Sequence, residues 1–189
     1  MSMFDSEINK ALEILKSKKI LLYPTDTVWG IGCDATSEEA VAKVYKIKKR
    51  IESKSLIVLV DGIDMLKKHI RKIPKDVLHV LAQRSDPTTI IYSDPEGLAK
   101  NVISTATTVA IRMVQNEFCR VLIEKFGKPI VSTSANISGS PTPKSFVEIE
   151  APILDCVDYV VNLQREKVNE KSSTILKLDE RGKITVLRE

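Results

Sequence analysis

The residues between positions 24 and 35 have the types and the placing of a ligand-binding loop. Thr25, Asp26 and Thr27 follow an apolar run at positions 20–23, which predicts a short buried strand. Ligands of open α/β sheets collect where strands end. Hydroxyl groups both donate and accept hydrogen bonds, so this segment predicts a site for a polar small molecule. An ordinary turn is the alternative that the segment by itself leaves open.

The segment from Lys43 to Lys54 is strongly basic. Its first two cations suit the C-terminal end of a predicted helix. The later ones run on into a loop, where they could neutralise a triphosphate or the phosphates of a nucleic acid. A solvated surface is the alternative. Against Glu52 alone, the segment holds Lys43, Lys46, Lys48, Lys49, Arg50 and Lys54.

Hydroxyl and amide groups are concentrated in residues 132–143. Five hydroxyl residues and Asn136 follow a short apolar strand between positions 132 and 140. Such groups suit a purine edge, a ribose or an amino-acid carboxylate. The chain has no G-x-S-x-G elbow and neither histidine is near this segment, so a serine hydrolase is not supported. A turn rich in Ser, Thr and Pro is the alternative.

A lone cation, Arg112, interrupts the apolar strand predicted at residues 107–113. A buried charge without a partner is costly, so Arg112 needs an anion if this strand is central. An edge strand, where the guanidinium reaches water, is the alternative.

The spacing Gly30-x-Gly32-x-x-Ala35 matches the dinucleotide fingerprint only loosely. The first glycine of that fingerprint ends a strand and opens a helix, whereas six residues separate Tyr23 from Gly30. The next helix is expected only near Ser37. A dehydrogenase that binds NAD is therefore kept only as an alternative.

Elements that could position these residues alternate along the chain. The hairpin predicted at the end favours a mixed sheet, and the interleaving indicates the α/β class with one sheet. Hydrophobic spacing predicts helices at 8–15, 37–47, 74–81 and 116–126, and strands at 20–23, 56–60, 88–92, 107–113, 129–131, 157–162, 173–178 and 183–187.

Composition excludes several classes of protein. The 189 residues suit one domain, and 43% hydrophobic with 29% charged residues is globular composition. The three cysteines and two histidines are scattered, so neither a disulfide scaffold nor a zinc ribbon is expected. Such cysteine usage is typical of a reducing compartment, and we therefore expect a cytoplasmic location. No uncharged apolar run approaches the roughly 20 residues of a membrane span, so no membrane partner is expected. The net charge of +4 is too small to name a partner.

In this order, the four segments resemble the YrdC family of threonylcarbamoyl-AMP synthases. The most specific stretches are YPTDTVWGIG at 23–32 and STSANISG at 132–139. Further family elements are matched by Lys48-Lys49-Arg50, Thr108-Val109-Ala110-Ile111-Arg112, Ser173-Thr174-Ile175 and Leu187-Arg188. The resemblance covers essentially the whole chain, so residues 1–189 are expected to form a single YrdC-like domain without the extra C-terminal domain of longer members.

The resemblance implies a twisted mixed sheet with flanking helices around a basic concave cleft. It also implies a nucleotidyltransferase that converts L-threonine, bicarbonate and ATP into threonylcarbamoyl-AMP and pyrophosphate. That reaction begins the threonylcarbamoyladenosine modification of tRNA next to the anticodon, which downstream threonylcarbamoyl-transferase proteins complete. Mg²⁺ is expected with the ATP, held mainly by phosphates, and no metal ligand is assigned in the protein. Some members bind double-stranded RNA.

The resemblance also assigns residues. Arg112 offers a charged fork to the carboxylate of threonine or to the carbamate. Lys48 and Arg50 are the candidate catalytic residues, with Lys48 beside the phosphates. The threonine site is expected to hold Thr27, Arg112, Ser134 and Ser173, and the ATP site Arg50, Lys54, Thr108, Asn136, Lys144 and Arg188.

Some positions depart from the family pattern. Leu59 stands where some members have a histidine that contacts threonine, so that contact must be absent or replaced. Lys144 stands where members often have Ser or Thr. A non-catalytic tRNA- or double-stranded-RNA-binding module of the same fold is the alternative, because YciO-like relatives diverge in the K-x-R and S-A-N elements. Both elements are present here, which favours the enzyme.

Overall fold

Helices and strands interleave along the whole chain in the computed structural model, which describes residues 2–51, 56–169, 172–179 and 182–189. The elements, in chain order, are α1 (Met3–Lys16), β1 (Leu21–Tyr23), β2 (Gly30–Gly32), α2 (Glu38–Lys48), β3 (Ile57–Val60), α3 (Ile63–His69), α4 (Lys75–Gln83), β4 (Thr88–Ser93), the 3₁₀ turn η1 (Lys100–Val102), β5 (Thr108–Met113), α5 (Glu117–Phe126), β6 (Ile130–Ser134), the 3₁₀ turn η2 (Phe146–Glu148), α6 (Ala151–Leu154), β7 (Tyr159–Val160), β8 (Thr174–Leu178) and β9 (Ile184–Arg188).

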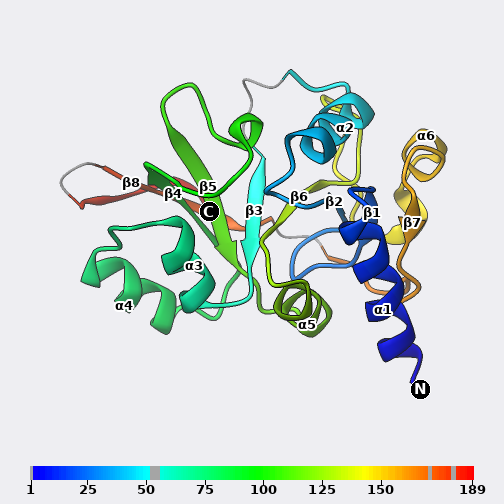
Figure 1. The fold of residues 1–189 in the computed structure, drawn as a ribbon, viewed down its shortest axis with the longest axis horizontal. Helices are drawn as coiled ribbons and strands as arrows, with labels where there is room; N and C mark the ends of the chain where they lie inside the picture. Colours follow the sequence, from blue (N-terminus) through cyan, green and yellow to red (C-terminus); the bar gives the residue numbers. More distant parts are fainter. Residues whose placement is uncertain (1, 52–55, 170–171, 180–181) are drawn as a thin grey trace.

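The strands of the described residues form one mixed sheet in the order β7-β1-β2-β6-β3-β5-β4-β8-β9. β3 pairs parallel with β5, and β4 pairs parallel with β8. The terminal hairpin β8–β9 is antiparallel, as are β2–β6 and β3–β6. The predicted α/β class with a single mixed sheet is confirmed, and Figure 1 shows its twist.

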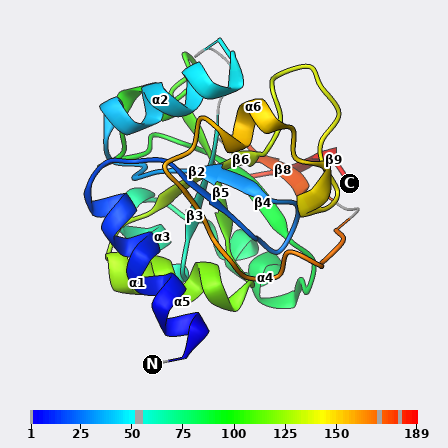
Figure 2. The same cartoon turned by 90° about the vertical axis from the view of Figure 1, so that its right-hand side faces the viewer.

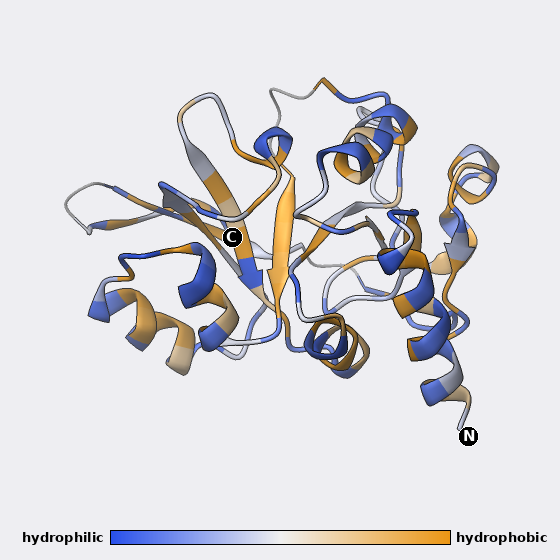
Figure 3. Cartoon of the chain, viewed as in Figure 1, coloured by the Kyte–Doolittle hydropathy of each residue, from blue (hydrophilic) through white to orange (hydrophobic). Residues whose placement is uncertain are grey.

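Helices cover the sheet on both sides. Figure 2 shows the strands between α2 and α6 on one side and α4 and α5 on the other. Helix α1 packs on α5, where the rings of Phe4 and Phe118 meet edge to face with centroids 6.3 Å apart. Strand β3 is apolar along its whole length in Figure 3, as expected for a strand near the middle of the sheet. No helix of the described residues is long and apolar enough to cross a membrane.

Alternation along the strands separates a core face from a face that is free to bind. Successive side chains of a strand point to opposite sides of the sheet. On β5, Val109 and Ile111 are buried in the hydrophobic core, whereas Ala110 and Arg112 line a cavity. The second face of the sheet is therefore the one on which the polar segments gather.

Local signals account for the helix ends. The side chains of Ser37 and Asn116 accept hydrogen bonds from the N–H groups of Ala40 and Cys119, which caps α2 and α5. Gly127 ends α5 in the left-handed conformation at φ 72°. These two helices therefore begin and end where the sequence predicts, within one or two residues.

Several predictions about elements were incomplete. Helix α1 begins at Met3 rather than at residue 8, and α3 was not predicted. The strand expected at 129–131 continues as β6 to Ser134, whereas the strand expected at 157–162 is only the two-residue β7. Strand β2 was not predicted, because a three-residue strand with two glycines has no apolar alternation. Its pairing with β1 also removes the dinucleotide-fingerprint interpretation, since Gly30 lies in an antiparallel strand rather than at a strand-to-helix turn.

Candidate functional site

The face of the sheet towards which Ala110 and Arg112 point carries a cavity of about 330 Å³. Its lining comes from β2, β3, β4, β5, β6, β8 and β9 and from the loops beside them. Three arginines take part, Arg50, Arg112 and Arg188, and the described lining residues include no carboxylate. The cavity therefore suits anionic groups, and we call it the cleft cavity.

Arg112 and Asp26 form a buried ion pair beside this cavity. Nη2 of Arg112 lies 3.0 Å from Oδ1 of Asp26, and the two side chains are 3% and 7% exposed. Strand β5 lies inside the sheet, so the edge-strand alternative for Arg112 is wrong. The Nε atom of Arg112 is buried and has no hydrogen-bond partner among the described residues.

Ser173 is held in the cleft-cavity lining by its neighbours. Its hydroxyl lies 2.8 Å from the hydroxyl of Thr89 on β4. Arg188 donates two hydrogen bonds to the Ser173 carbonyl oxygen, at 3.2 Å from Nε and 2.8 Å from Nη2. This network fixes a hydroxyl and a guanidinium on the same wall of the cleft cavity.

The loop 24–29 and strand β2 form the third wall. Thr27 donates its backbone N–H to the hydroxyl of Thr25 at 3.0 Å, and their hydroxyl oxygens are 3.1 Å apart. A β-carbon on Gly30 would lie 2.8 Å from Oγ of Ser132. One on Gly32 would collide with the carbonyl oxygen of Val131. Gly30 and Gly32, which resembled part of a nucleotide-binding motif, are therefore required by packing. The neighbouring strand and side chains leave no room for a β-carbon at either position.

The structure places Lys48 behind the cleft cavity rather than in its lining. Its ammonium donates to the carbonyl oxygens of Ser134 and Asn136, at 2.5 and 2.7 Å, and to Oδ1 of Asn136 at 3.3 Å. The side chain is buried, and burial together with the charge of Arg50 lowers the pKa of Lys48 to about 8. Lys48 thus anchors the loop after β6, with its ammonium bonded to Ser134 and Asn136.

The end of α2 separates Lys48 from Arg50. Lys49 adopts the left-handed conformation at φ 49°, and the Arg50 N–H bonds to the carbonyl oxygen of Tyr45 at 3.0 Å. This helix-ending turn directs Lys48 inward and brings Arg50 into the lining of the cleft cavity. The two matched positions of the K-x-R element are therefore placed for different tasks.

The S-A-N element forms a second, smaller hollow next to the first. Oγ of Ser134 donates to Oδ1 of Asn136 at 2.6 Å, and Nδ2 of Asn136 donates to the Ser140 carbonyl oxygen at 2.6 Å. Asn136 lines a cavity of about 120 Å³, which shares Thr142 with the cleft cavity. Ser134 lines the larger one.

Three further positions singled out in the sequence are not in the cleft-cavity lining. The Thr108 hydroxyl lies 2.7 Å from that of Ser104, outside the cavity. Lys144 is exposed and also outside it. Leu59 is fully buried, opposite Arg112 in the pairing of β3 with β5. Lys54 lies outside the described residues.

Asp26 was noted in the sequence but given no role, because nothing in one sequence shows that it faces Arg112, 86 positions away. Thr142 was also missed, since it lies in a stretch that reads as a turn. No group of three or more metal-ligating side chains occurs in the described part of the chain. The donors around the cleft cavity are hydroxyls and guanidiniums, so a Mg²⁺ ion there would have to be held mainly by phosphate oxygens.

Comparison with known proteins identifies relatives of this chain. Residues 13–189 match the Sua5/YciO/YrdC family, which is described as "Telomere recombination". The threonylcarbamoyl-AMP synthase of Pseudoalteromonas translucida (strain TAC 125) is 34% identical over 168 residues, which cover 83% of this chain and 86% of that protein. The one from Shigella flexneri is 31% identical over 169 residues, covering 86% and 87%.

A solved structure has the same fold. The crystal structure of P. abyssi Sua5 complexed with L-threonine superposes with a TM-score of 0.84 at 26% sequence identity. The match covers 96% of this chain but 53% of the P. abyssi chain, so the present chain spans about half of that protein's length.

Proposed function

Because this chain belongs to the Sua5/YciO/YrdC family, we propose that it is a threonylcarbamoyl-AMP synthase, a nucleotidyltransferase acting on L-threonine, bicarbonate and ATP. The observation that carries the proposal is the cleft cavity, where three arginines and several hydroxyls converge without a lining carboxylate among the described residues. Two anionic reactants, an amino-acid carboxylate and a triphosphate, need such a surplus of positive charge.

We assign threonine to the side of the cleft cavity near Arg112. The guanidinium of Arg112 lines the cavity, which supports a bond to the substrate carboxylate. The hydroxyls of Thr27, Ser134 and Ser173, which line the same cavity, supply further partners. A carboxylate so held leaves the amine free to react.

ATP then occupies the side of Arg50 and Arg188, towards the small cavity at Asn136. Arg50 and Arg188 carry the positive charge there, and Lys48 acts as a positioning residue through the loop 134–140. Lys54, Thr108 and Lys144 remain proposed ATP contacts, and none of them is in the described lining of the cavity. We expect Mg²⁺ to arrive with the nucleotide.

The proposed reaction has two steps. The threonine amine attacks the carbon of carbon dioxide, which dehydration of bicarbonate supplies, and loses a proton to give a carbamate. A carbamate oxygen then attacks the α-phosphorus of ATP, and the bond to the β-phosphate oxygen breaks to release pyrophosphate. Positioning and charge stabilisation dominate such a transfer, which is what guanidiniums on a rigid sheet supply. We place this activity in the cytoplasm at the start of tRNA modification, with threonylcarbamoyl-transferase proteins downstream.

The direct test is pyrophosphate release from ATP with bicarbonate and Mg²⁺, with and without L-threonine. The proposal requires release that depends on threonine and a product with the mass of threonylcarbamoyl-AMP. Arg112→Gln should lower kcat/KM for threonine by at least about a hundredfold, because a buried charged hydrogen bond is lost.

Arg120→Gln is the matched control, since that arginine is exposed on α5 and should leave turnover unchanged. Release that is indifferent to threonine contradicts the proposal. A chain that binds RNA but shows no turnover would instead fit the non-catalytic alternative.

A further inference from the structure

Thr89 is a buried polar residue on β4 that lies directly opposite Arg112 in the pairing of β4 with β5. Its side chain is fully buried and is not in the lining of the cleft cavity. In the described part of the chain, its hydroxyl has one hydrogen-bond partner, the hydroxyl of Ser173 at 2.8 Å. Any hydrogen bonding by which Thr89 influences the cleft cavity therefore passes through Ser173.

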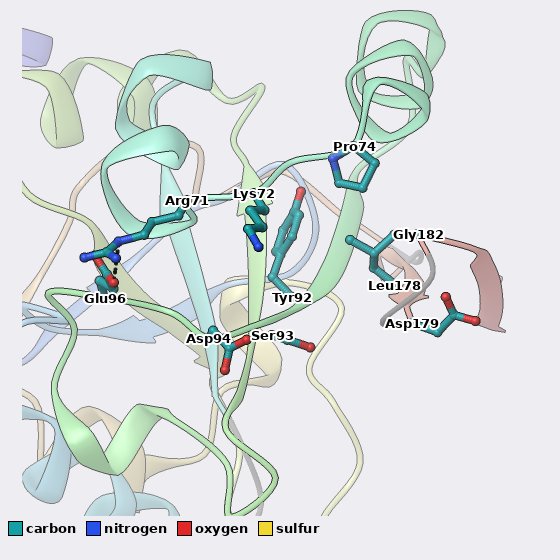
Figure 4. A pocket seen from close by; sticks show the side chains of 10 residues that line it. All are labelled: Arg71, Lys72, Pro74, Tyr92, Ser93, Asp94, Glu96, Leu178, Asp179 and Gly182. Carbon is teal, nitrogen blue, oxygen red and sulfur yellow. Dashed lines mark ion pairs between the residues drawn. The ribbon is translucent and has the colours of Figure 1, made fainter.

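Strand β4 presents its residues to two different sides of the sheet. Ile91 lines the cleft cavity, whereas the next residue, Tyr92, lines a separate cavity of about 580 Å³ (Figure 4). Because side chains alternate along a strand, Thr89 points to the same side as Ile91, and Thr88 to the same side as Tyr92. The Thr89 hydroxyl therefore lies on the cleft side of the sheet, in the row that also holds Arg112.

The surroundings of the two hydroxyls decide which of them donates. Each hydroxyl has one proton to give and lone pairs that accept. If Ser173 donated to Thr89, the Thr89 proton would be buried without an acceptor among the described residues, which is costly. If Thr89 donates to Ser173, its own proton is satisfied and the Ser173 proton is released for other use. The second arrangement is therefore the favoured one.

Arg188 provides a second donor to the same oxygen. Its Nη2 lies 3.5 Å from the hydroxyl oxygen of Ser173, and a guanidinium can only donate. The lone pairs of the Ser173 hydroxyl thus face Thr89 and Arg188, and its proton is the part that a ligand can use. Ser173 lines the cleft cavity, so this proton is available to whatever the cavity binds.

We propose that Thr89 is a positioning residue, which by donating to Ser173 holds the Ser173 hydroxyl as a hydrogen-bond donor to the carboxylate of bound threonine. This role rests on the proposed function and adds to it the direction of the bond and the residue that sets it. The carboxylate is the acceptor because Thr89 is paired with Arg112, so the guanidinium and the hydroxyl serve the same anion. A carboxylate only accepts hydrogen bonds, so a donor at Ser173 suits it.

The test compares the threonine kinetics of two substitutions at position 89, measured by pyrophosphate release with ATP and bicarbonate in excess. Thr89→Val keeps the branched shape and removes the hydroxyl, whereas Thr89→Ser keeps the hydroxyl. The carboxylate takes no part in the bonds that form and break, so losing a contact to it raises KM with little change in kcat. We expect Thr89→Val to raise the KM for threonine about five- to tenfold, and Thr89→Ser to stay within about twofold of the wild type.

Thr88→Val is the matched control, because it removes the neighbouring hydroxyl, which donates to the carbonyl oxygen of Asp86 at 3.0 Å. It should leave the KM for threonine within about twofold of the wild type. A double variant separates positioning from general packing. In a Ser173→Ala background, Thr89→Val should raise the KM no further, because the hydroxyl through which Thr89 acts is already gone.

Three results would overturn the role of Thr89: an unchanged KM in Thr89→Val, a lower kcat at unchanged KM, or effects of Thr89→Val and Ser173→Ala that simply multiply. The melting temperature of Thr89→Val shows whether a higher KM is lost folding, and Thr89→Ala is a second deletion of the hydroxyl that must give the same KM. A wild type without threonine-dependent release contradicts the synthase itself, and that result is known before any variant is compared.

Discussion

At the scale of single residues, the site depends on one buried charge being balanced by another. Arg112 and Asp26 are both nearly inaccessible to water. Their mutual attraction offsets the free energy that is lost when each charge is removed from water. The same pairing limits how the guanidinium can turn.

Asp26→Asn should therefore be severely destabilising although the two side chains have the same shape. The uncharged amide leaves the Arg112 charge buried and uncompensated, and we expect a loss of about 3–5 kcal/mol in the free energy of unfolding. Chemical denaturation measures it. Glu39→Gln is the control, because its partner Lys43 and Glu39 itself are largely exposed, and it should cost far less. Equal losses in the two variants would show that burial does not decide the effect.

Lys48 shows where inference from residue types ends. Its place in a basic run predicts contact with phosphates, whereas its ammonium is enclosed by three oxygens of the loop after β6. Sequence spacing cannot distinguish these outcomes, because the left-handed turn at Lys49 decides which side chain turns inward.

Lys48→Met tests the anchoring role through pH. The pKa of Lys48 is about 8 in the folded chain, below the ordinary 10.5, so between these pH values the unfolded chain binds more protons. The stability contributed by this group therefore rises with pH across that window. We expect the wild type to gain on the order of 1–3 kcal/mol over Lys48→Met between pH 8 and 10.5 in urea titrations. A difference that stays constant with pH would contradict the buried ammonium.

At the scale of elements, hydrophobic pattern and caps were sufficient for α2 and α5 and for the strands β3, β4 and β5. Ser37, Asn116 and Gly127 are local signals, and they act over one turn of helix. The pattern was insufficient for β2, because this strand is defined by its pairing with β1 and with the distant β6. Short strands are specified by tertiary packing rather than by propensity.

Gly32→Ala is the sharpest test of that packing. The added β-carbon would collide with the carbonyl oxygen of Val131 and lie 2.7 Å from Cε1 of Tyr23. Neither backbone nor a buried ring can yield easily, so we expect a loss of at least about 2–3 kcal/mol. Gly62→Ala is the matched control, since a β-carbon there meets nothing within 4 Å and should change stability by less than about 1 kcal/mol. Thermal denaturation of both variants measures the contrast, and similar melting temperatures would contradict it.

At the scale of the whole molecule, the cleft cavity gathers residues from position 27 to position 188. Motif order in the sequence predicted that these segments belong together, and the sheet brings Thr27, Arg50, Arg112, Ser134 and Ser173 to one cavity. Which side chains these residues contact could not be predicted. Those contacts depend on the strand order β6-β3-β5-β4-β8, which follows from long-range pairing. The predicted roles of these residues await the kinetic tests described above.

Arg188 gives the molecule one more property. It lies on β9, which stands at the edge of the described sheet and pairs there with β8 alone, while its guanidinium reaches the Ser173 carbonyl in the cleft cavity. An edge hairpin of this kind opens more easily than the interior strands, so its amides exchange with solvent first. A ligand that engages Arg188 must oppose that opening. At a free concentration of a hundred times its dissociation constant, such a ligand would slow amide exchange in β8 and β9 by about a hundredfold. The protection factors of these amides would therefore report whether the cleft cavity is occupied.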